Sequence, residues 1–232
     1  MMKEADIIQQ AEKALRGCLE SPLFIQSVEF EREFSTDASQ PELIARITTS
    51  DGEKNIIIEV KNNGQPRYTR QAINKLTLYA QRSNDSYGVF IAPYISPASA
   101  QMLKEAGIGY VDFAGNCFLN FEKIFIRIEG KPNPFPQNKE LRTLFSPKSS
   151  RILRVLLNDP FVAWKVDELS KKAEVSLGLV AEVKKILLDR EWITEKTVGF
   201  ALAKPKEWLQ EWASKYDYRK NRISDLYSMK DE

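Results

Sequence analysis

The chain has 232 residues, which is long enough for two compact domains of ordinary size. Hydrophobic residues make up 43% and charged residues 28%, a globular balance that argues against disorder. There is no histidine and there are only 2 cysteines, so Ser-His-Asp catalysis, Cys-His catalysis and zinc sites of imidazole or clustered cysteine are excluded. No glycine-rich phosphate loop occurs either, which argues against a P-loop ATPase or a dinucleotide-binding enzyme. Any chemistry must use carboxylates and lysine, with or without a hard metal ion.

The net charge of +2 is small, but it is unevenly distributed. Residues 1–140 hold 16 basic and 18 acidic side chains, whereas residues 141–232 hold 18 and 14. A basic module beside an acidic one suits a DNA-binding unit joined to a metal-using unit, although a solvated basic helix face gives the same counts. No apolar run approaches the roughly 20 residues that cross a bilayer, and no signal peptide is visible. Because Cys18 and Cys117 make no disulfide framework, we expect a cytoplasmic protein.

The first 130 residues alternate between predicted helices and strands. The helices are expected at residues 5–19, 66–82 and 97–107. The strands are expected at residues 27–34, 43–49, 55–61, 87–92, 108–113 and 117–128. Residues 50–53 carry a glycine-containing turn, which makes the two strands around them a hairpin. The order predicts an α/β domain with a mixed sheet and helices on its faces.

The remaining chain predicts a linker and a helical domain. Residues 130–138 contain three prolines and can continue neither a helix nor a central strand. Helices are expected at residues 149–158, 165–173, 176–190 and 206–215, with a two-stranded wing at 193–202. Three helices followed by a wing are the layout of a winged helix-turn-helix. The predicted domains are an α/β domain at 1–130, a linker at 131–140, a winged helix at 141–204 and a helical extension at 205–232.

The most informative segment is the end of the strand at 55–61. Glu59 and Lys61 stand two residues apart after an apolar run, so their side chains project from the same face. Glu42 begins the preceding strand of the same hairpin, and it is expected to meet them at one sheet edge. A carboxylate pair can hold Mg²⁺, and a lysine can stabilise the charge that develops in phosphodiester hydrolysis. By chance alone, however, a Glu-x-Lys at a strand end is usually an exposed pair of charges.

This arrangement resembles the PD-(D/E)xK nucleases, which have the restriction-endonuclease-like fold. Pro41-Glu42 stands where that superfamily has Pro-Asp, and Glu59-Val60-Lys61 matches the second half of the motif. The resemblance implies an Mg²⁺-dependent DNA endonuclease, with Mn²⁺ as a substitute, whose metal is held by Glu42 and Glu59. Glu42 departs from the usual aspartate, so its reach toward a metal differs.

The same resemblance implies further site residues. Gln71 fits the polar residue that often follows in the next helix, and Glu12 or Glu4 fits an acid in the first helix. For Glu12, an exposed helix face is the commoner explanation. Residues 62–66 are expected to form a flexible loop. Arg67 and Arg70 follow it and are candidates for phosphate contacts, or else they are solvated residues of a first helical turn.

A narrower resemblance involves residues 92–97 and 106–116. With the stretch Glu59–Arg70, these segments are similar to the AbiEi-like antitoxins of type IV toxin–antitoxin systems, which combine a restriction-endonuclease-like domain with a winged helix. Members of that family are treated as transcriptional regulators. The resemblance also implies that this protein has a nucleotidyltransferase-like toxin as its partner. We expect Asp112 and Asn116 to supply turn geometry rather than catalysis.

The predicted third helix of the winged helix carries an apolar stripe, and its other face is polar. In this motif the N-terminal residues of the recognition helix lie nearest the bases. The candidate DNA contacts are Ser176, Lys184 and Lys185 on the helix and Lys196 on the wing. This face has no arginine before its C-terminal end, so a protein-interaction role is also open.

Two hypotheses therefore come from the sequence. In the first, the protein is a Mg²⁺-dependent endonuclease that its winged helix directs to double-stranded DNA. In the second, it is a non-catalytic regulator of the antitoxin kind, with the same fold used for binding DNA or a partner. The DNA target and the oligomeric state are open in both.

Overall fold

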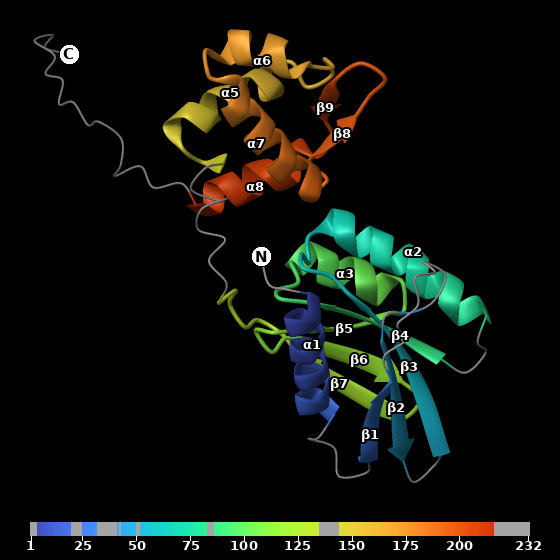
Figure 1. Cartoon of the computed structure of the whole chain (residues 1–232). Helices are drawn as coiled ribbons and strands as arrows, with labels where there is room; N and C mark the ends of the chain where they lie inside the picture. Colours follow the sequence, from blue (N-terminus) through green and yellow to red (C-terminus); the bar gives the residue numbers. More distant parts are fainter. Residues whose placement is uncertain are drawn as a thin grey trace, which may run out of the picture. The chain divides into compact units, whose positions relative to one another are not determined.

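The structure is a computed structural model that describes residues 4–19, 25–31, 41, 43–49, 52–82, 86–134 and 144–215. The chain divides into two compact units, Met1–Lys139 and Glu140–Glu232 (Figure 1). Each unit has its own hydrophobic core. In the part of the chain that is described, no helix is both long enough and apolar enough to cross a membrane.

The first unit is built on a seven-stranded mixed sheet in which the strands follow one another in chain order. The central strands β3, β4 and β5 are parallel, and the outer strands pair antiparallel. The strands are β1 (Ile25–Glu31), β2 (Leu43–Thr49), β3 (Gly52–Val60), β4 (Ser86–Ala92), β5 (Gly109–Asp112), β6 (Cys117–Phe121) and β7 (Ile124–Ile128). The expectation of a mixed sheet in an α/β unit is therefore confirmed.

Helices cover both faces of this sheet (Figure 1). Helix α1 (Glu4–Leu19) buries Ile7, Ala11 and Leu15 against one face. Helices α2 (Pro66–Arg82) and α3 (Pro97–Glu105) pack on the other face, where Leu76 and Leu103 are fully buried. The alternation along β3 shows this division, because Ile56 and Ile58 join the core under α1 whereas Ile57 joins the core under α2.

Several predicted boundaries agree closely with the structure. Helix α2 covers the predicted residues, beginning at Pro66, and Ser96 caps α3 by accepting a hydrogen bond from the Ser99 N–H at 3.2 Å. The hairpin of β2 and β3 is also present, although β3 begins at Gly52 rather than at Asn55. The expected turn residues 50 and 51 and the expected end of the first strand at 32–34 lie outside the described residues.

The prediction of one strand over residues 117–128 is wrong. The segment forms two antiparallel strands, β6 and β7, joined by a tight turn at Glu122 and Lys123. Glu122 has a φ of 50°, a left-handed conformation that favours glycine or asparagine. Because neither residue type stands there, the sequence carried no turn signal.

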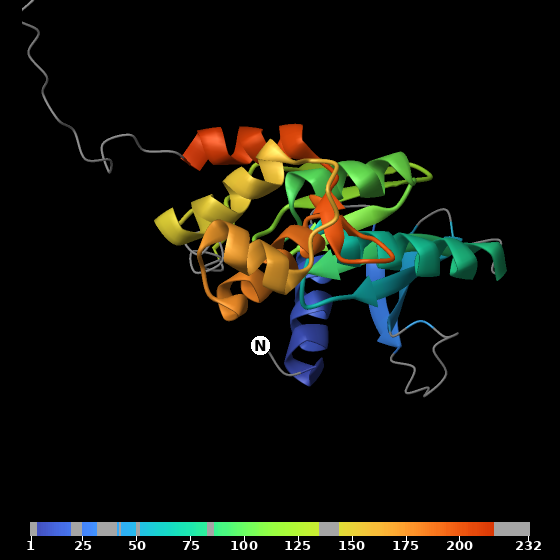
Figure 2. The same cartoon turned by 90° about the horizontal axis from the view of Figure 1, so that it is seen from above.

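The second unit contains four described helices and a hairpin. The helices are α5 (Pro147–Asn158), α6 (Val166–Ala173), α7 (Leu177–Asp189) and α8 (Pro205–Lys215), and the hairpin strands are β8 (Ile193–Glu195) and β9 (Phe200–Leu202). Helices α5, α6 and α7 lie side by side in both views (Figures 1 and 2). Leu153, Leu169, Val183 and Trp208 are at most 1% exposed and form the centre of the core.

Candidate functional site

The candidate site lies at the edge of the sheet where the parallel strands β3, β4 and β5 end. In sheets with helices on both faces, this carboxyl edge is where ligands usually bind. The starts of α2 and α3 lie at the same edge, because they directly follow β3 and β4 along the chain. The unpaired N–H groups at helix starts carry partial positive charge. The edge therefore favours anionic ligands before any side chain is considered.

Glu59 is the central residue of this edge. Its side chain is fully buried, and its Oε1 atom lies 2.6 Å from Nζ of Lys61 and 3.1 Å from Nζ of Lys75. Neither contact has the angles of a hydrogen bond, so both are ion pairs. The contact with Lys61, which directly follows β3, confirms the prediction that the side chains of Glu59 and Lys61 project together. Lys75 comes from α2 and was not among the site residues predicted from the sequence.

The Oε2 atom of Glu59 is buried and accepts no hydrogen bond from any described residue. Leaving a buried acceptor unsatisfied costs about 1–3 kcal/mol, and more for a charged group. Such an atom is suited to a ligand that brings positive charge, and a hard divalent cation prefers carboxylate oxygens. The donor chemistry of Glu59 therefore fits a metal ligand, but a metal needs further donors. Within the described ranges, no group of three Asp, Glu, Cys or His residues gathers to hold one.

Glu42, the second predicted metal ligand, lies outside the described residues. Its neighbour Leu43 pairs with Ile58, which is the neighbour of Glu59. The predicted convergence of Glu42 with Glu59 and Lys61 therefore stays a prediction.

Two other sequence candidates do not contact Glu59. Gln71 is exposed on α2, four residues before Lys75, and it gives no hydrogen bond to either oxygen of Glu59. Glu12 is half-buried on α1, which covers the opposite face of the sheet from α2. The side chain of Glu4 lies outside the described ones. Of the residues that the superfamily resemblance named, the described structure joins only Glu59 and Lys61.

The segment after Lys61 is held by hydrogen bonds, which corrects the expectation of a flexible loop. The Lys61 N–H donates to the Ile91 carbonyl at 2.9 Å, and the Ser96 N–H donates to the Gly64 carbonyl at 3.2 Å. Asn63 accepts at its Oδ1 from the Gln65 N–H at 3.0 Å, which forms a local turn. These bonds fix the start of α2 beside the start of α3.

Gly64 makes this arrangement possible. It forms an isolated parallel bridge with Ile95. A Cβ atom at Gly64 would lie 2.2 Å from the carbonyl oxygen of Tyr94. Only glycine allows the two backbones to approach this closely.

Asp112 and Asn116 form a hydrogen-bonded turn at the end of β5, as the sequence predicted. Asp112 Oδ1 accepts from the Asn116 N–H at 2.8 Å, and Oδ2 accepts from Asn116 Nδ2 at 2.9 Å and from the Ile95 N–H at 3.2 Å. Burial raises the pKa of the Asp112 carboxyl, and the hydrogen bonds that it accepts oppose this shift. Asn116 also bonds the backbone of Lys131. With these oxygens occupied, Asp112 serves the fold of the edge.

Helix α2 adds positive charge beside Glu59. It contains four basic residues, Arg67, Arg70, Lys75 and Arg82, and no acidic residue. Arg67 and Arg70 are exposed in the first turn of the helix. Their exposure agrees with both interpretations of the sequence, a phosphate contact and a solvated helical turn.

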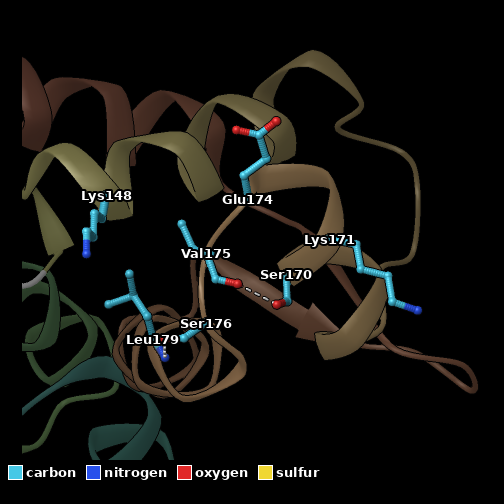
Figure 3. A pocket seen from close by; sticks show the side chains of 7 residues that line it. All are labelled: Lys148, Ser170, Lys171, Glu174, Val175, Ser176 and Leu179. Atoms are coloured by element: carbon cyan, nitrogen blue, oxygen red, sulfur yellow. Dashed lines mark hydrogen bonds between the residues drawn. The ribbon is translucent and has the colours of Figure 1, made fainter.

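In the second unit, the start of α7 adjoins a pocket of about 480 Å³ (Figure 3). Ser176 caps α7 by accepting a hydrogen bond from the Leu179 N–H at 3.3 Å, and its side chain is exposed. Lys148 and Lys171 lie on opposite sides of the pocket (Figure 3). The start of the predicted recognition helix is therefore accessible and has basic side chains near it.

The three lysines predicted to contact DNA have different surroundings. Lys184 Nζ lies 3.1 Å from Glu195 Oε1 and 5.3 Å from the ring centroid of Phe200, so it is occupied by contacts with the hairpin. Lys185 on α7 and Lys196 between β8 and β9 are exposed. The pairing of Lys184 with the hairpin could not be found from the spacing within α7 alone.

Comparisons with protein-family models and with curated protein sequences gave no match. Among solved structures, the chain is similar to a repair endonuclease from Pyrococcus abyssi, with 10% identity and a TM-score of 0.33 over 48% of this chain and 47% of that one. It is also similar to EndoMS in a complex with double-stranded DNA, with 19% identity and a TM-score of 0.29 over 44% and 43% of the two chains. EndoMS in its apo form matches with 18% identity and a TM-score of 0.32 over 53% and 48%. The chain spans about half the length of each of these proteins or less.

Proposed function

We propose that the protein hydrolyses phosphodiester bonds in double-stranded DNA with the help of a divalent cation. One observation carries this proposal: a fully buried carboxylate, Glu59, has an unsatisfied oxygen and two lysine ammonium groups beside it at the carboxyl edge of parallel strands. The basic helix α2 begins at the same edge. Together these features suit a polyanionic substrate and a cationic cofactor.

The residues at this edge have distinct roles in the proposal. Glu59 and Glu42 would hold Mg²⁺, or Mn²⁺ in its place. The bound cation would neutralise charge on the phosphate and favour ionisation of the attacking water. Lys61 would donate hydrogen bonds to the oxygens that gain negative charge as the phosphorus–oxygen bond to the leaving group breaks. Gln71 remains a candidate for orienting the water or the substrate.

The second unit would supply most of the DNA affinity as a winged helix. Its element order, three helices and then a hairpin, is the order of that motif. In this proposal Ser176 and Lys185 contact DNA from α7, and Lys196 contacts a phosphate from the hairpin. Arg67 and Arg70 would contact phosphates at the start of α2.

The direct test is plasmid cleavage by the full-length chain. We expect nicking or cleavage with Mg²⁺ or Mn²⁺ and none with EDTA, because the carboxylates alone cannot ionise water for attack. Metal uptake by DNA-free protein is measured in parallel by calorimetry. DNA binding with neither metal uptake nor cleavage in any divalent ion would contradict the nuclease proposal.

A second measurement tests the DNA contacts of the second unit. The slope of log K against log salt for duplex binding is expected to fall by about 1 in magnitude for Lys185→Ala and for Lys196→Ala, since each removes one phosphate contact. Lys184→Ala is the matched comparison. Because Lys184 is already paired with Glu195, its replacement should change the slope less. Equal slopes for all three variants and the wild-type protein would favour a protein-interaction role for this unit.

A non-catalytic DNA-binding regulator is the second candidate function. It is favoured because no group of three metal-binding side chains gathers within the described residues, and because two lysines already pair with Glu59. In this proposal the protein acts as an antitoxin-like regulator with a nucleotidyltransferase-like partner. Cleavage by the wild-type chain separates the two candidates.

A further inference from the structure

The two edge strands of the seven-stranded sheet, β1 and β7, differ in how they are protected. An edge strand presents unpaired N–H and C=O groups, and proteins usually block it with charges, proline or a β-bulge. Strand β1 has such devices, because a bulge lies between Ile25 and Ser27 and its exposed side chains include Glu29 and Glu31. Strand β7 reads Ile-Phe-Ile-Arg-Ile, with no bulge, no proline and a single charge. By these criteria β7, unlike β1, is suited to pairing with a further strand.

Strand β7 also exposes large apolar side chains. Phe125 is 64% and Ile128 is 39% exposed, and in the described part of the first unit the only other exposed large hydrophobic residue is Leu78 on α2. The Phe125 ring lies edge-on to Phe118, with centroids 6.0 Å apart, on the face of the sheet that carries α2 and α3. Arg127 lies on the same face, two residues further along, and its side chain is 59% exposed. An apolar edge strand of this kind is a template for pairing with another chain.

The hydrogen bonds of the sheet determine which residues of β7 face the open edge. In an antiparallel ladder, alternate residues direct both backbone groups to the same neighbouring strand. The Asn116 carbonyl, just before β6, accepts from the Asp112 N–H at 2.9 Å, so residues 116, 118 and 120 face β5 and residues 117, 119 and 121 face β7. Their partners on β7 are residues 128, 126 and 124. The backbone N–H and C=O groups of Phe125 and Arg127 therefore point outward, where no described residue bonds them.

We propose that β7 pairs with β7 of a second copy of this chain, in an antiparallel ladder centred on Ile126. In this register Phe125 of each copy lies opposite Arg127 of the other, and these outward-facing residues exchange backbone hydrogen bonds. Opposite side chains lie about 5 Å apart on the same face, so each guanidinium can contact the opposite phenyl ring. On the other face Ile126 meets Ile126, and Ile124 meets Ile128.

A second copy is the partner that β7 fits, because the strand complements itself. Its two outward-facing residues are a cation and an aromatic ring, and the two-fold axis brings each against the other. Its second face is isoleucine at every position. An unrelated strand would match both faces only by chance. This inference does not depend on the proposed nuclease function, and its tests do not measure cleavage.

The first test is the oligomeric state of the full-length chain without DNA, measured by sedimentation. The ladder is only five residues long, and interfaces well below about 1,200 Å² are weak, so we expect a reversible dimer that dissociates on dilution. A wild-type chain that stays monomeric at every concentration would overturn the proposal and leave the edge to a different partner.

Two substitutions at Phe125 test the register. Phe125→Lys and Phe125→Glu both replace the ring by a charge, but lysine would face Arg127 of the other copy with like charge and glutamate with opposite charge. We expect the dissociation constant of the dimer to rise at least about tenfold for Phe125→Lys and to stay within about threefold of the wild-type value for Phe125→Glu. Leu78→Lys is the control, since it changes an exposed apolar residue on α2, and its dimer should dissociate as the wild-type dimer does. Equal weakening by both Phe125 variants would overturn the proposal.

Cross-linking tests the same register without changing Phe125, in case its variants fail to fold. Ile126→Cys places two thiols directly opposite each other, with Cα atoms about 4.5 Å apart, and oxidised glutathione should couple them into a disulfide. Ile128→Cys is the matched control on the same face, because its two copies would lie roughly 14 Å apart, too far for a disulfide. The buried Cys18 and Cys117 are common to both variants. A covalent dimer from both variants, or from neither, would overturn the proposal.

Discussion

The Lys61→Ala variant is expected to cleave DNA at least about 100-fold more slowly than the wild-type chain, while its affinity for DNA stays nearly the same. Lys61 follows β3 and its ammonium group lies beside the buried Glu59, where a charge contact is poorly screened. Removal of one such donor from a developing negative charge usually costs two to three orders of magnitude in rate, or about 3–4 kcal/mol. DNA affinity should hardly change, because the second unit supplies most of it in our proposal.

Three further variants complete this measurement. Glu59→Ala should lose both metal uptake and cleavage, since Glu59 is a metal ligand in our proposal. Glu42→Asp restores the residue usual in the superfamily and should retain or improve activity, if the longer carboxylate only holds the cation less well. Lys123→Ala is the control, because Lys123 lies exposed in the turn between β6 and β7. Plasmid cleavage and calorimetry are measured for all four proteins. Cleavage by Lys61→Ala at the wild-type rate would contradict the proposal that this edge of the sheet is the catalytic site.

Much of the first unit follows from local patterns in the sequence. The apolar runs before Glu59 and in β4 predict strands buried on both faces, and Pro66 marks the first residue of α2. Burial and proline geometry determine these elements, so each of them can be predicted from its own segment of the sequence. The turn at Glu122 could not be read in this way, because the surrounding strand pairing imposes a conformation that glutamate does not favour.

The site was predictable only where its geometry is local. Glu59 lies in β3 and Lys61 directly follows this strand, so the period of two residues along the extended chain places their side chains together. Lys75 comes from a helix that crosses this strand, so its contact depends on how α2 packs. The sequence does indicate that Lys75 lies near the packed face of α2. Ala72, Leu76 and Tyr79 form the buried stripe of this helix, and Lys75 borders that stripe. Nothing in the spacing, however, states which strand the stripe covers.

Gly64→Ala is expected to destabilise the first unit by about 2–3 kcal/mol, because a Cβ atom has no room there. The clash would be with the Tyr94 carbonyl oxygen at 2.2 Å, and a backbone atom cannot turn aside as a side chain can. Relief requires the chain after Lys61 to move away from Ile95. That movement should break the hydrogen bond from Ser96 to the Gly64 carbonyl and shift the start of α2. Cleavage should then fall by about tenfold or more, since a displacement near 1 Å can cost 100-fold.

The two units allow this prediction to be measured cleanly. All four tryptophans, at positions 164, 192, 208 and 212, lie in the second unit, so tryptophan fluorescence reports on that unit alone. Far-ultraviolet circular dichroism reports on both. In urea, Gly64→Ala should lower the urea concentration at which the circular dichroism signal of the first unit is lost. The midpoint of the fluorescence change should stay the same, because each unit has its own core.

Gly17→Ala is the matched control for this substitution. Gly17 lies in α1, and a Cβ there would meet nothing within 4 Å. The same chemical change should therefore stabilise the first unit by about 0.5–1 kcal/mol, since alanine favours the helix. Opposite signs for the two alanine variants would locate the effect in the close approach of Gly64 to Tyr94. If Gly64→Ala unfolds at the urea concentration of the wild-type chain, the backbones at this edge are farther apart than the bridge to Ile95 requires.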